Sequence, residues 1–90
     1  MNESEPDALD ARRRRLLYRA THRGTHETDL LVGGFVARHL SSLTPEQLDE
    51  LEIILEYPDT DLADWLTGRQ PIPADAAQPL LRRMRAEAAG

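Results

Sequence analysis

The stretch that decides the fold reads Arg23-Gly24-Thr25-His26-Glu27-Thr28-Asp29. Apolar residues recur at helical spacing before and after it, which predicts a corner between two helices. Gly24 can take the left-handed backbone conformation that ends a helix, and Thr25 can cap the next one. Glu27 and Asp29 then fall in the first turn of that second helix, where carboxylates meet the positive end of the dipole. At this corner we expect Arg23 and Glu27 to be partly exposed.

The first predicted helix runs from about residue 7 to the corner, and the second runs from the corner to about Leu40. Leu30 and Leu31 contribute to the apolar face of the second helix. The pair Gly33-Gly34 lies in the middle of that helix and costs about 1 kcal/mol per glycine relative to alanine. Such a pair predicts a kink or a close backbone approach, so the second helix should be irregular there.

The third predicted helix carries the clearest start signals in the chain. Thr44 is the expected N-cap, Pro45 takes the first helical position, and Gln47 completes a capping box. The residue before a proline avoids helical geometry, so Tyr57-Pro58 is expected to end this helix.

Two further helices complete the prediction. A short fourth helix runs from Asp59 to Gly68, and it depends on burying Trp65 because so few residues cannot hold a helix in water alone. A fifth helix is expected from about Ala74 to Ala88, with its first turn distorted or delayed by Pro79.

The predicted fold class is all-α, a compact five-helix bundle. No stretch alternates with the period of two that marks a strand. A flexible tail is expected over residues 1–6 and a single helical domain over residues 7–88. We expect Trp65 to be largely buried in this domain.

Composition narrows the possible functions of this 90-residue chain. It is 40% hydrophobic and 30% charged, as is usual for a soluble globular protein. There is no cysteine, which excludes disulfides and cysteine-based zinc sites. The net charge of -5 argues against general nucleic-acid binding. No apolar run approaches the roughly 20 residues of a membrane span, and the acidic N-terminus does not look like a secretion signal.

The polar clusters admit more than one interpretation. The capping and dipole rules alone account for the residues of the corner, yet a charged loop on a rigid helical scaffold is also where binding residues lie. His22 and His26 have a spacing that metal sites use on a helix, but Gly24 is expected to break the shared helical face. No nucleophile motif, phosphate-binding loop or dinucleotide fingerprint is present.

Arginines in the first helix recur every three or four residues and form a basic stripe, which consists of Arg12, Arg15, Arg19 and Arg23. The stripe could bind phosphate groups or RNA, or it could be a solvated face in which Arg12, Arg13 and Arg14 are dispensable. A third possibility is that it pairs with the acidic residues of the third and fourth helices. Only Tyr18 supplies an aromatic ring among these arginines, so a nucleic-acid platform is poorly supported.

Two motifs together resemble a known family. Arg23, Gly24 and Glu27 form an Arg-Gly-x-x-Glu motif, and an Asp-x-Asp-Leu-x-Asp-Trp-Leu pattern runs from Asp59 to Leu66. At this spacing they resemble the small bacterial and mitochondrial flavinylation factors called SdhE, or succinate dehydrogenase assembly factor. The resemblance covers about Leu16 to Met84. Members of that family are five-helix domains that bind the flavoprotein subunit of succinate dehydrogenase, or in some bacteria fumarate reductase, and promote covalent attachment of FAD to it.

The resemblance implies an assembly factor without an active site, a metal or a cofactor of its own, because FAD is attached to the partner. The implied partner is the flavoprotein subunit, with no nucleic acid and no membrane insertion, and a monomer in the bacterial cytoplasm is expected. The resemblance implies Arg23, Gly24 and Glu27 as partner-binding residues, and we expect Arg19, His26 and Asp29 beside them to contribute to the same surface. The alternatives are a helical interaction module or antitoxin-like protein with another partner, and an RNA-binding protein.

Overall fold

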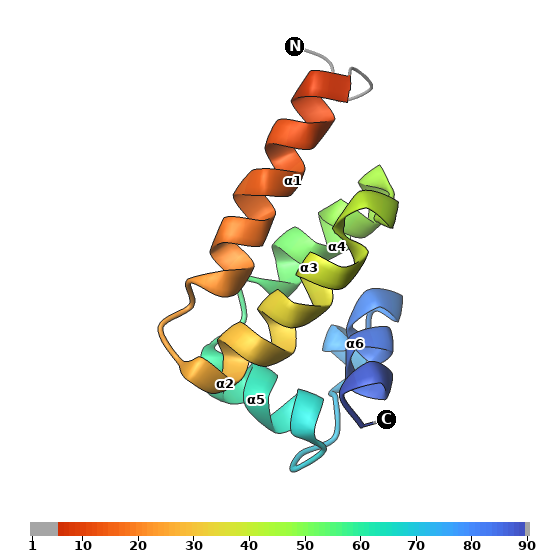
Figure 1. The fold of residues 1–90 in the computed structure, drawn as a ribbon. Helices are drawn as coiled ribbons and strands as arrows, with labels where there is room; N and C mark the ends of the chain where they lie inside the picture. Colours follow the sequence, from red (N-terminus) through yellow and green to blue (C-terminus); the bar gives the residue numbers. More distant parts are fainter. Residues whose placement is uncertain (1–5, 90) are drawn as a thin grey trace.

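The computed structural model describes residues 6–89 and confirms the all-α fold class (Figure 1). No strand occurs in this described part of the chain. The predicted tail over residues 1–6 lies outside the described residues, except for Pro6, where the first helix begins. The elements are α1 (Pro6–Thr21), α2 (His26–Thr28), the π-helical turn η1 (Asp29–Gly33), α3 (Gly34–His39), the 3-10 turn η2 (Leu40–Ser42), α4 (Pro45–Ile54), α5 (Asp59–Thr67), the 3-10 turn η3 (Ala74–Ala76) and α6 (Pro79–Ala89).

The helices enclose one apolar core. Helix α1 packs against η1, α3 and α4, while α5 packs against α6 and α2. Figure 1 shows α5 at the bottom of the view, close to α2 and on the way to α6. None of the described helices is both long and apolar enough to cross a membrane. The largest fully buried side chains are Phe35, Leu43, Leu48, Leu51, Ile54, Leu62, Leu66, Leu80, Leu81, Met84, Val32 and Val36.

The second predicted helix is irregular at the expected place. It consists of α2, η1 and α3 in succession, so the π-helical turn ends at Gly33 and regular helix resumes at Gly34. A Cβ atom at Gly33 would lie 3.0 Å from the carbonyl oxygen of Ala20 and 2.7 Å from Cγ2 of Thr21. The backbone of η1 therefore approaches α1 so closely that only glycine fits, which confirms the close approach predicted from the glycine pair.

We expect Gly33→Ala to lower the free energy of unfolding by about 1–3 kcal/mol, because overpacking forces side chains or backbone to shift. The Thr21 hydroxyl donates to the Leu17 carbonyl at 2.9 Å, so Thr21 cannot rotate away freely. Gly34→Ala is the matched control: its new Cβ would meet only the flexible Arg38 guanidinium, at 3.3 Å. That substitution should instead stabilise by up to about 1 kcal/mol through helix propensity. Thermal melts of the two variants should shift in opposite directions, and equal shifts would contradict the close approach.

Helix α4 begins as predicted and ends slightly early. The Thr44 side chain accepts from the Gln47 backbone, and the Gln47 side chain accepts from the Thr44 backbone, so the capping box is confirmed. Regular helix stops at Ile54, and the chain tightens into a turn before Pro58, with Tyr57 N–H donating to the Ile54 carbonyl at 3.1 Å. The last carbonyls of a helix have no partner within the helix, so this end needs an external donor.

The last two helices confirm the sequence-based reading. Helix α5 ends at Gly68, whose φ of 81° is left-handed, and Trp65 is buried with 8% of its surface exposed. The fifth predicted helix is delayed: η3 forms a single turn at Ala74–Ala76, and α6 starts at Pro79. Proline cannot donate within a helix, which is why α6 begins at this residue.

Helix α6 is tied to α3 by a cluster around Glu87. One Glu87 carboxylate oxygen lies 2.8 Å from Nε2 of His39 and 3.5 Å from the Arg38 guanidinium, and the other lies 3.3 Å from Arg83. The hydrogen bond from His39 is the main cause that lowers the pKa of Glu87. The Arg83 guanidinium also lies over the Phe35 ring, 5.4 Å from its centroid. These contacts fix the face that α6 presents to solvent.

Candidate functional site

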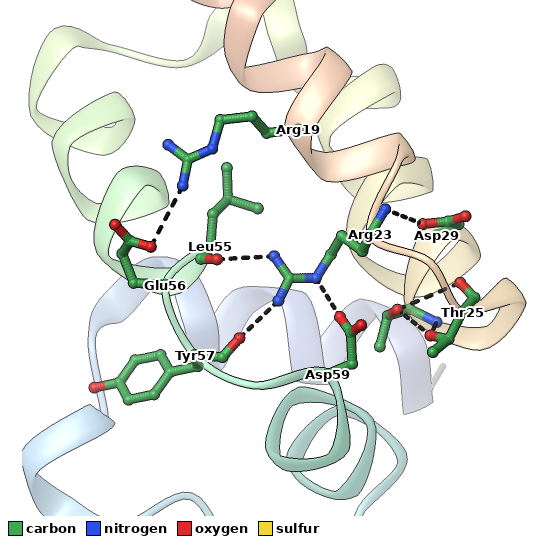
Figure 2. A network of polar contacts seen from close by, with 9 residues as sticks. Arg19, Arg23, Thr25, Asp29, Leu55, Glu56, Tyr57 and Asp59 are labelled. Atoms are coloured by element: carbon green, nitrogen blue, oxygen red, sulfur yellow. Dashed lines mark hydrogen bonds and ion pairs between the residues drawn. The ribbon is translucent and has the colours of Figure 1, made fainter.

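Arg23 lies at the centre of the corner and makes four hydrogen bonds (Figure 2). Its Nε donates to the Asp59 carboxylate at 2.6 Å, and its two terminal nitrogens donate to the carbonyls of Leu55 at 2.9 Å and Tyr57 at 2.6 Å. Its backbone N–H donates to Asp29 at 2.8 Å. One side chain therefore joins the end of α1 to the segment between α4 and α5.

These contacts stabilise two helix ends, the C-terminal end of α4 and the N-terminal end of α5. The carbonyls of Leu55 and Tyr57 follow the last turn of α4, where unsatisfied oxygens and the negative end of the helix dipole favour a cation. Asp59 is the first residue of α5, where a carboxylate is favoured. The planar guanidinium of Arg23 can donate to all three acceptors at once, which a lysine ammonium could not do with the same geometry.

Short local hydrogen bonds close the corner itself. Gly24 has a φ of 101°, which confirms its glycine-favouring conformation. Thr25 caps α2 by accepting from the Thr28 backbone N–H at 3.3 Å, and the hydroxyls of the two threonines also hydrogen bond to each other. The corner is not crowded at this position, because a Cβ on residue 24 would have no neighbour within 4 Å. Substitution at Gly24 is strained by its φ alone.

Glu27 faces solvent and pairs with an arginine from the segment after α5. Arg69 donates to Glu27 at 3.2 Å and to Asp64 at 3.0 Å. The side chains of Glu27 and Arg69 remain 49% and 53% exposed. Hydrogen bonds with Asp64, and then with Glu27, raise the pKa of Arg69 above its usual value. Because exposed pairs of this kind contribute little to stability, both side chains remain available to another molecule.

An open groove of about 280 Å³ lies between the corner and the first turns of α5. Three carboxylates line it, and each is paired with an arginine of the same chain: Asp59 with Arg23, and Glu27 and Asp64 with Arg69. The exposed ion pair of Glu27 and Arg69 forms part of the groove lining. The lining residues are Thr25, Glu27, Asp59, Thr60, Ala63, Asp64 and Arg69.

The structure divides the predicted site residues into those engaged within the corner and those exposed to solvent. Arg23 is partly exposed as a residue, as expected, but only 9% of its side chain is exposed, so its guanidinium is largely enclosed. The reason is that three acceptors from the α4–α5 segment surround it. Asp29 is likewise occupied by the Arg23 backbone. His26 and Glu27 are exposed, and Arg19 is 44% exposed, 3.6 Å from Glu56.

The basic stripe of α1 pairs with acidic residues of the same chain. Arg12 is buried, and its guanidinium lies 2.6 Å from Asp49 and 3.3 Å from Glu52. Arg13 donates to the Leu43 carbonyl at 2.9 Å. The idea that Arg12, Arg13 and Arg14 form a dispensable solvated face is therefore wrong for the first two. Intramolecular pairing, one of the alternatives left open by the sequence, describes three of the four arginines of the stripe, namely Arg12, Arg19 and Arg23.

The histidines of the corner are not arranged around a common centre. His22 stacks on Tyr18, with ring centroids 4.0 Å apart, and its Nδ1 hydrogen bonds to the Tyr18 carbonyl at 2.9 Å. This contact lies at the end of α1, which stops at Thr21, two residues before the predicted end. Within the described residues, no group of three or more histidine, aspartate or glutamate side chains is placed to hold a metal ion.

Sequence reasoning missed two surface residues beside the corner. Arg69 follows the Gly68 cap and belongs to no periodic pattern in the sequence. Its contact with Glu27 is evident only from the structure, in which α5 packs against α2. Leu30 was assigned to an apolar face, yet it is 60% exposed because the π-helical turn η1 changes the register of the helix. An exposed leucine near Glu27 in the sequence adds apolar surface to a mainly charged corner.

Comparison with known proteins shows which family this chain is similar to. Residues 14–88 match the family model described as "Flavinator of succinate dehydrogenase". The chain is 58% identical over 78 residues to the FAD assembly factor SdhE of Acetobacter pasteurianus, a match that covers 87% of this chain and 72% of that protein. It is 43% identical over 70 residues to the mitochondrial succinate dehydrogenase assembly factor 2 of Candida glabrata, which covers 74% of this chain but only 46% of the relative.

A more distant relative extends over a similar region. The mitochondrial succinate dehydrogenase assembly factor 2 of Dictyostelium discoideum is 30% identical over 79 residues, covering 88% of this chain and 56% of that protein. The matched regions include the corner and α5, the two parts that Arg23 joins. The chain belongs to the family of flavinators of succinate dehydrogenase, the succinate dehydrogenase assembly factors.

Proposed function

We propose that this chain binds the flavoprotein subunit of succinate dehydrogenase, or of fumarate reductase, and promotes covalent attachment of FAD to that subunit. The proposal is supported by the family match, which spans residues 14–88. The observation that carries the choice of surface is the exposed Glu27 beside its groove, held on a corner that Arg23 makes rigid. In this proposal the chain acts as an assembly factor and holds no cofactor of its own.

The proposed roles of the corner residues differ. Arg23 and Asp29 build the corner from inside, because their polar groups are already engaged with the same chain. Gly24 leaves open space in front of the turn, where a partner can approach the backbone. Glu27 and His26 supply the side chains that contact the flavoprotein. Arg19 lies nearby at the end of α1, and Figure 2 shows its guanidinium directed toward Glu56.

A surface of this kind can promote a reaction without reacting itself. The bound flavin and the partner's own side chains supply the chemistry. The assembly factor need only bind one conformation of the flavoprotein more tightly than the others, which shifts the population toward it. Holding reacting groups in the correct orientation can lower a barrier by several kcal/mol. A rigid corner suits this task because it does not reorganise on binding.

Glu27→Ala tests the proposed surface. The substitution removes a first-turn carboxylate and an exposed ion pair, so stability should fall by only about 0.5–1.5 kcal/mol. A charged group that becomes buried on docking contributes more, and its truncation can cost about 2–5 kcal/mol of binding free energy. We expect the folded variant to support covalent FAD attachment at least about tenfold less well at limiting concentration. In-gel flavin fluorescence of the flavoprotein subunit measures the product.

Glu46→Ala is the matched control. Glu46 is an exposed carboxylate in the first turn of α4 and makes no ion pair among the described residues. Its removal disturbs a helix dipole in the same way but touches no part of the corner, so attachment should continue normally. If the Glu27 variant supports normal attachment at limiting concentration, the corner is not the working surface. If neither the wild-type chain nor the control promotes attachment, the proposed function itself fails.

A further inference from the structure

A second groove, larger than the one at the corner, lies on the outer face of α6. It has a volume of about 630 Å³ and is bounded by α6 and by the segment between α5 and α6. A groove of this size is within the range of ligand and peptide sites. Its lining residues are Pro71, Ile72, Ala74, Ala77, Arg82, Arg85, Ala86 and Ala89.

The groove is formed in advance by local hydrogen bonds. Ala76 N–H donates to the Pro73 carbonyl at 3.0 Å, and Gln78 N–H donates to the Ala76 carbonyl at 2.8 Å, which fixes the η3 turn. Ala76 is buried, and Ile72 packs against the core from the same segment. The wall opposite α6 is therefore held in place by the fold and needs no ligand to order it.

The charged side chains that line this groove are all cationic. Arg82 and Arg85 line it, no carboxylate does, and neither arginine makes an ion pair within residues 6–89. In contrast, Arg83 on the adjacent face of α6 is bound to Glu87. Most other arginines also have carboxylate partners, namely Arg12, Arg13, Arg19, Arg23, Arg38 and Arg69. Arg82 and Arg85 thus bring two unpaired cations to one groove, while Arg14 and Arg15 on α1 are the other arginines without an ion pair in residues 6–89.

The arrangement on α6 places cationic and apolar surface side by side. Positions 82, 85, 86 and 89 are spaced by three, one and three residues, so they share one face of the helix. Arg82 and Arg85 occupy its beginning, whereas Ala86 and Ala89 leave small apolar surface beyond them. A ligand that fits this face needs carboxylates at one end and an aliphatic group at the other.

We propose that this α6 groove binds an acidic segment of a partner protein, in which an aliphatic side chain neighbours two carboxylates. The carboxylates pair with Arg82 and Arg85, and the aliphatic side chain lies over Ala86 and Ala89. Planar guanidinium groups suit this recognition because they bind carboxylates bidentately. The open shape of the groove favours a peptide segment over an enclosed small molecule. This binding site is separate from the corner and does not depend on the function proposed for it.

The test uses the full chain labelled with nitrogen-15 and a capped peptide that carries one leucine followed by two aspartates. Backbone amide shifts should change for residues 71–77 and 82–89 and leave the corner unaffected. A peptide with asparagines in place of the aspartates should bind about tenfold more weakly, because two partly exposed ion pairs are lost. A peptide with glycine in place of leucine should also bind more weakly.

Variants of the chain localise the binding. R82E/R85E should weaken binding of the aspartate peptide by about tenfold or more, whereas R14E/R15E, which reverses two arginines of α1, should leave it unchanged. Ala86→Leu is a second probe: it fills the groove at an exposed helical position without altering the core, and it should also block binding. Absence of shifts in the groove at millimolar peptide, or equal binding of the asparagine peptide, would overturn the proposal. Octanoate binding as tightly as the peptide would overturn it too, in favour of a free amphipathic anion.

Discussion

Arg23→Ala is expected to lower the free energy of unfolding by about 2–4 kcal/mol, a large part of the roughly 5–13 kcal/mol available to a domain of this size. The arginine is 9% exposed and its partner Asp59 is 26% exposed, so water screens the pair only in part. Truncation also leaves the carbonyls of Leu55 and Tyr57 without their donor. Urea denaturation followed by circular dichroism measures the loss.

Arg19→Ala is the matched control for Arg23→Ala. Both arginines lie near the end of α1 and reach toward the α4–α5 segment (Figure 2). Arg19 is 44% exposed and lies 3.6 Å from Glu56, so its removal should cost less than about 1 kcal/mol. Arg23→Lys should be intermediate, because it keeps the charge but loses the fork that serves three acceptors. A denaturation midpoint for Arg23→Ala as close to wild type as that of Arg19→Ala would show that the contacts of Arg23 do not hold the corner.

The position of Arg23 changes how the Arg-Gly-x-x-Glu motif is understood. A loss of flavinylation in an Arg23 variant would mix damage to the fold with damage to docking. Glu27 does not have this ambiguity, since its side chain is exposed and Arg69, its only ion-pair partner among the described residues, is exposed as well. The motif thus combines a structural arginine, a glycine required by its φ, and a surface carboxylate.

The parts of the fold that the sequence predicted are those set by local rules. The capping box at Thr44, the left-handed cap at Gly68 and the late start at Pro79 each depend on residues within one turn. The close approach at Gly33 was also predicted, because a glycine pair in a helix is disfavoured unless something requires it.

The parts that the sequence did not predict depend on contacts between distant segments. Arg23 and Asp59 are 36 positions apart, and Arg69 and Glu27 are 42 apart. Periodicity identifies an arginine stripe but cannot say which carboxylates it meets. The π-helical turn η1 gave no signal either, and it is the reason that Leu30 faces solvent. The candidate residues were therefore found from sequence, while their division into scaffold and surface required the structure.

Trp65→Ala is expected to cost about 3–5 kcal/mol, comparable with or larger than the loss for Arg23→Ala. The indole is 8% exposed and meets the Tyr57 ring edge-on, with centroids 5.0 Å apart. Such an aromatic pair contributes about 0.5–1.5 kcal/mol beyond the area that it buries. Helix α5 has nine residues, too few to persist without packing, so loss of the indole should loosen the whole helix.

Loosening of α5 should also destabilise the corner, because this helix carries the carboxylates that bind Arg23 and Arg69. Asp59 binds Arg23 and Asp64 binds Arg69, so Trp65→Ala should weaken both contacts. The effects of Trp65→Ala and Arg23→Ala should then be less than additive in the double variant, as is usual for coupled sites. Trp65→Phe keeps an aromatic ring, so it should fold and lose less stability than Trp65→Ala. If the alanine variant is unfolded, the double-mutant cycle with Arg23→Ala can be measured with Trp65→Phe instead. Circular dichroism is the appropriate probe, since Trp65 is the only tryptophan of the chain. Full additivity with Arg23→Ala would mean that α5 holds its carboxylates in place without the indole.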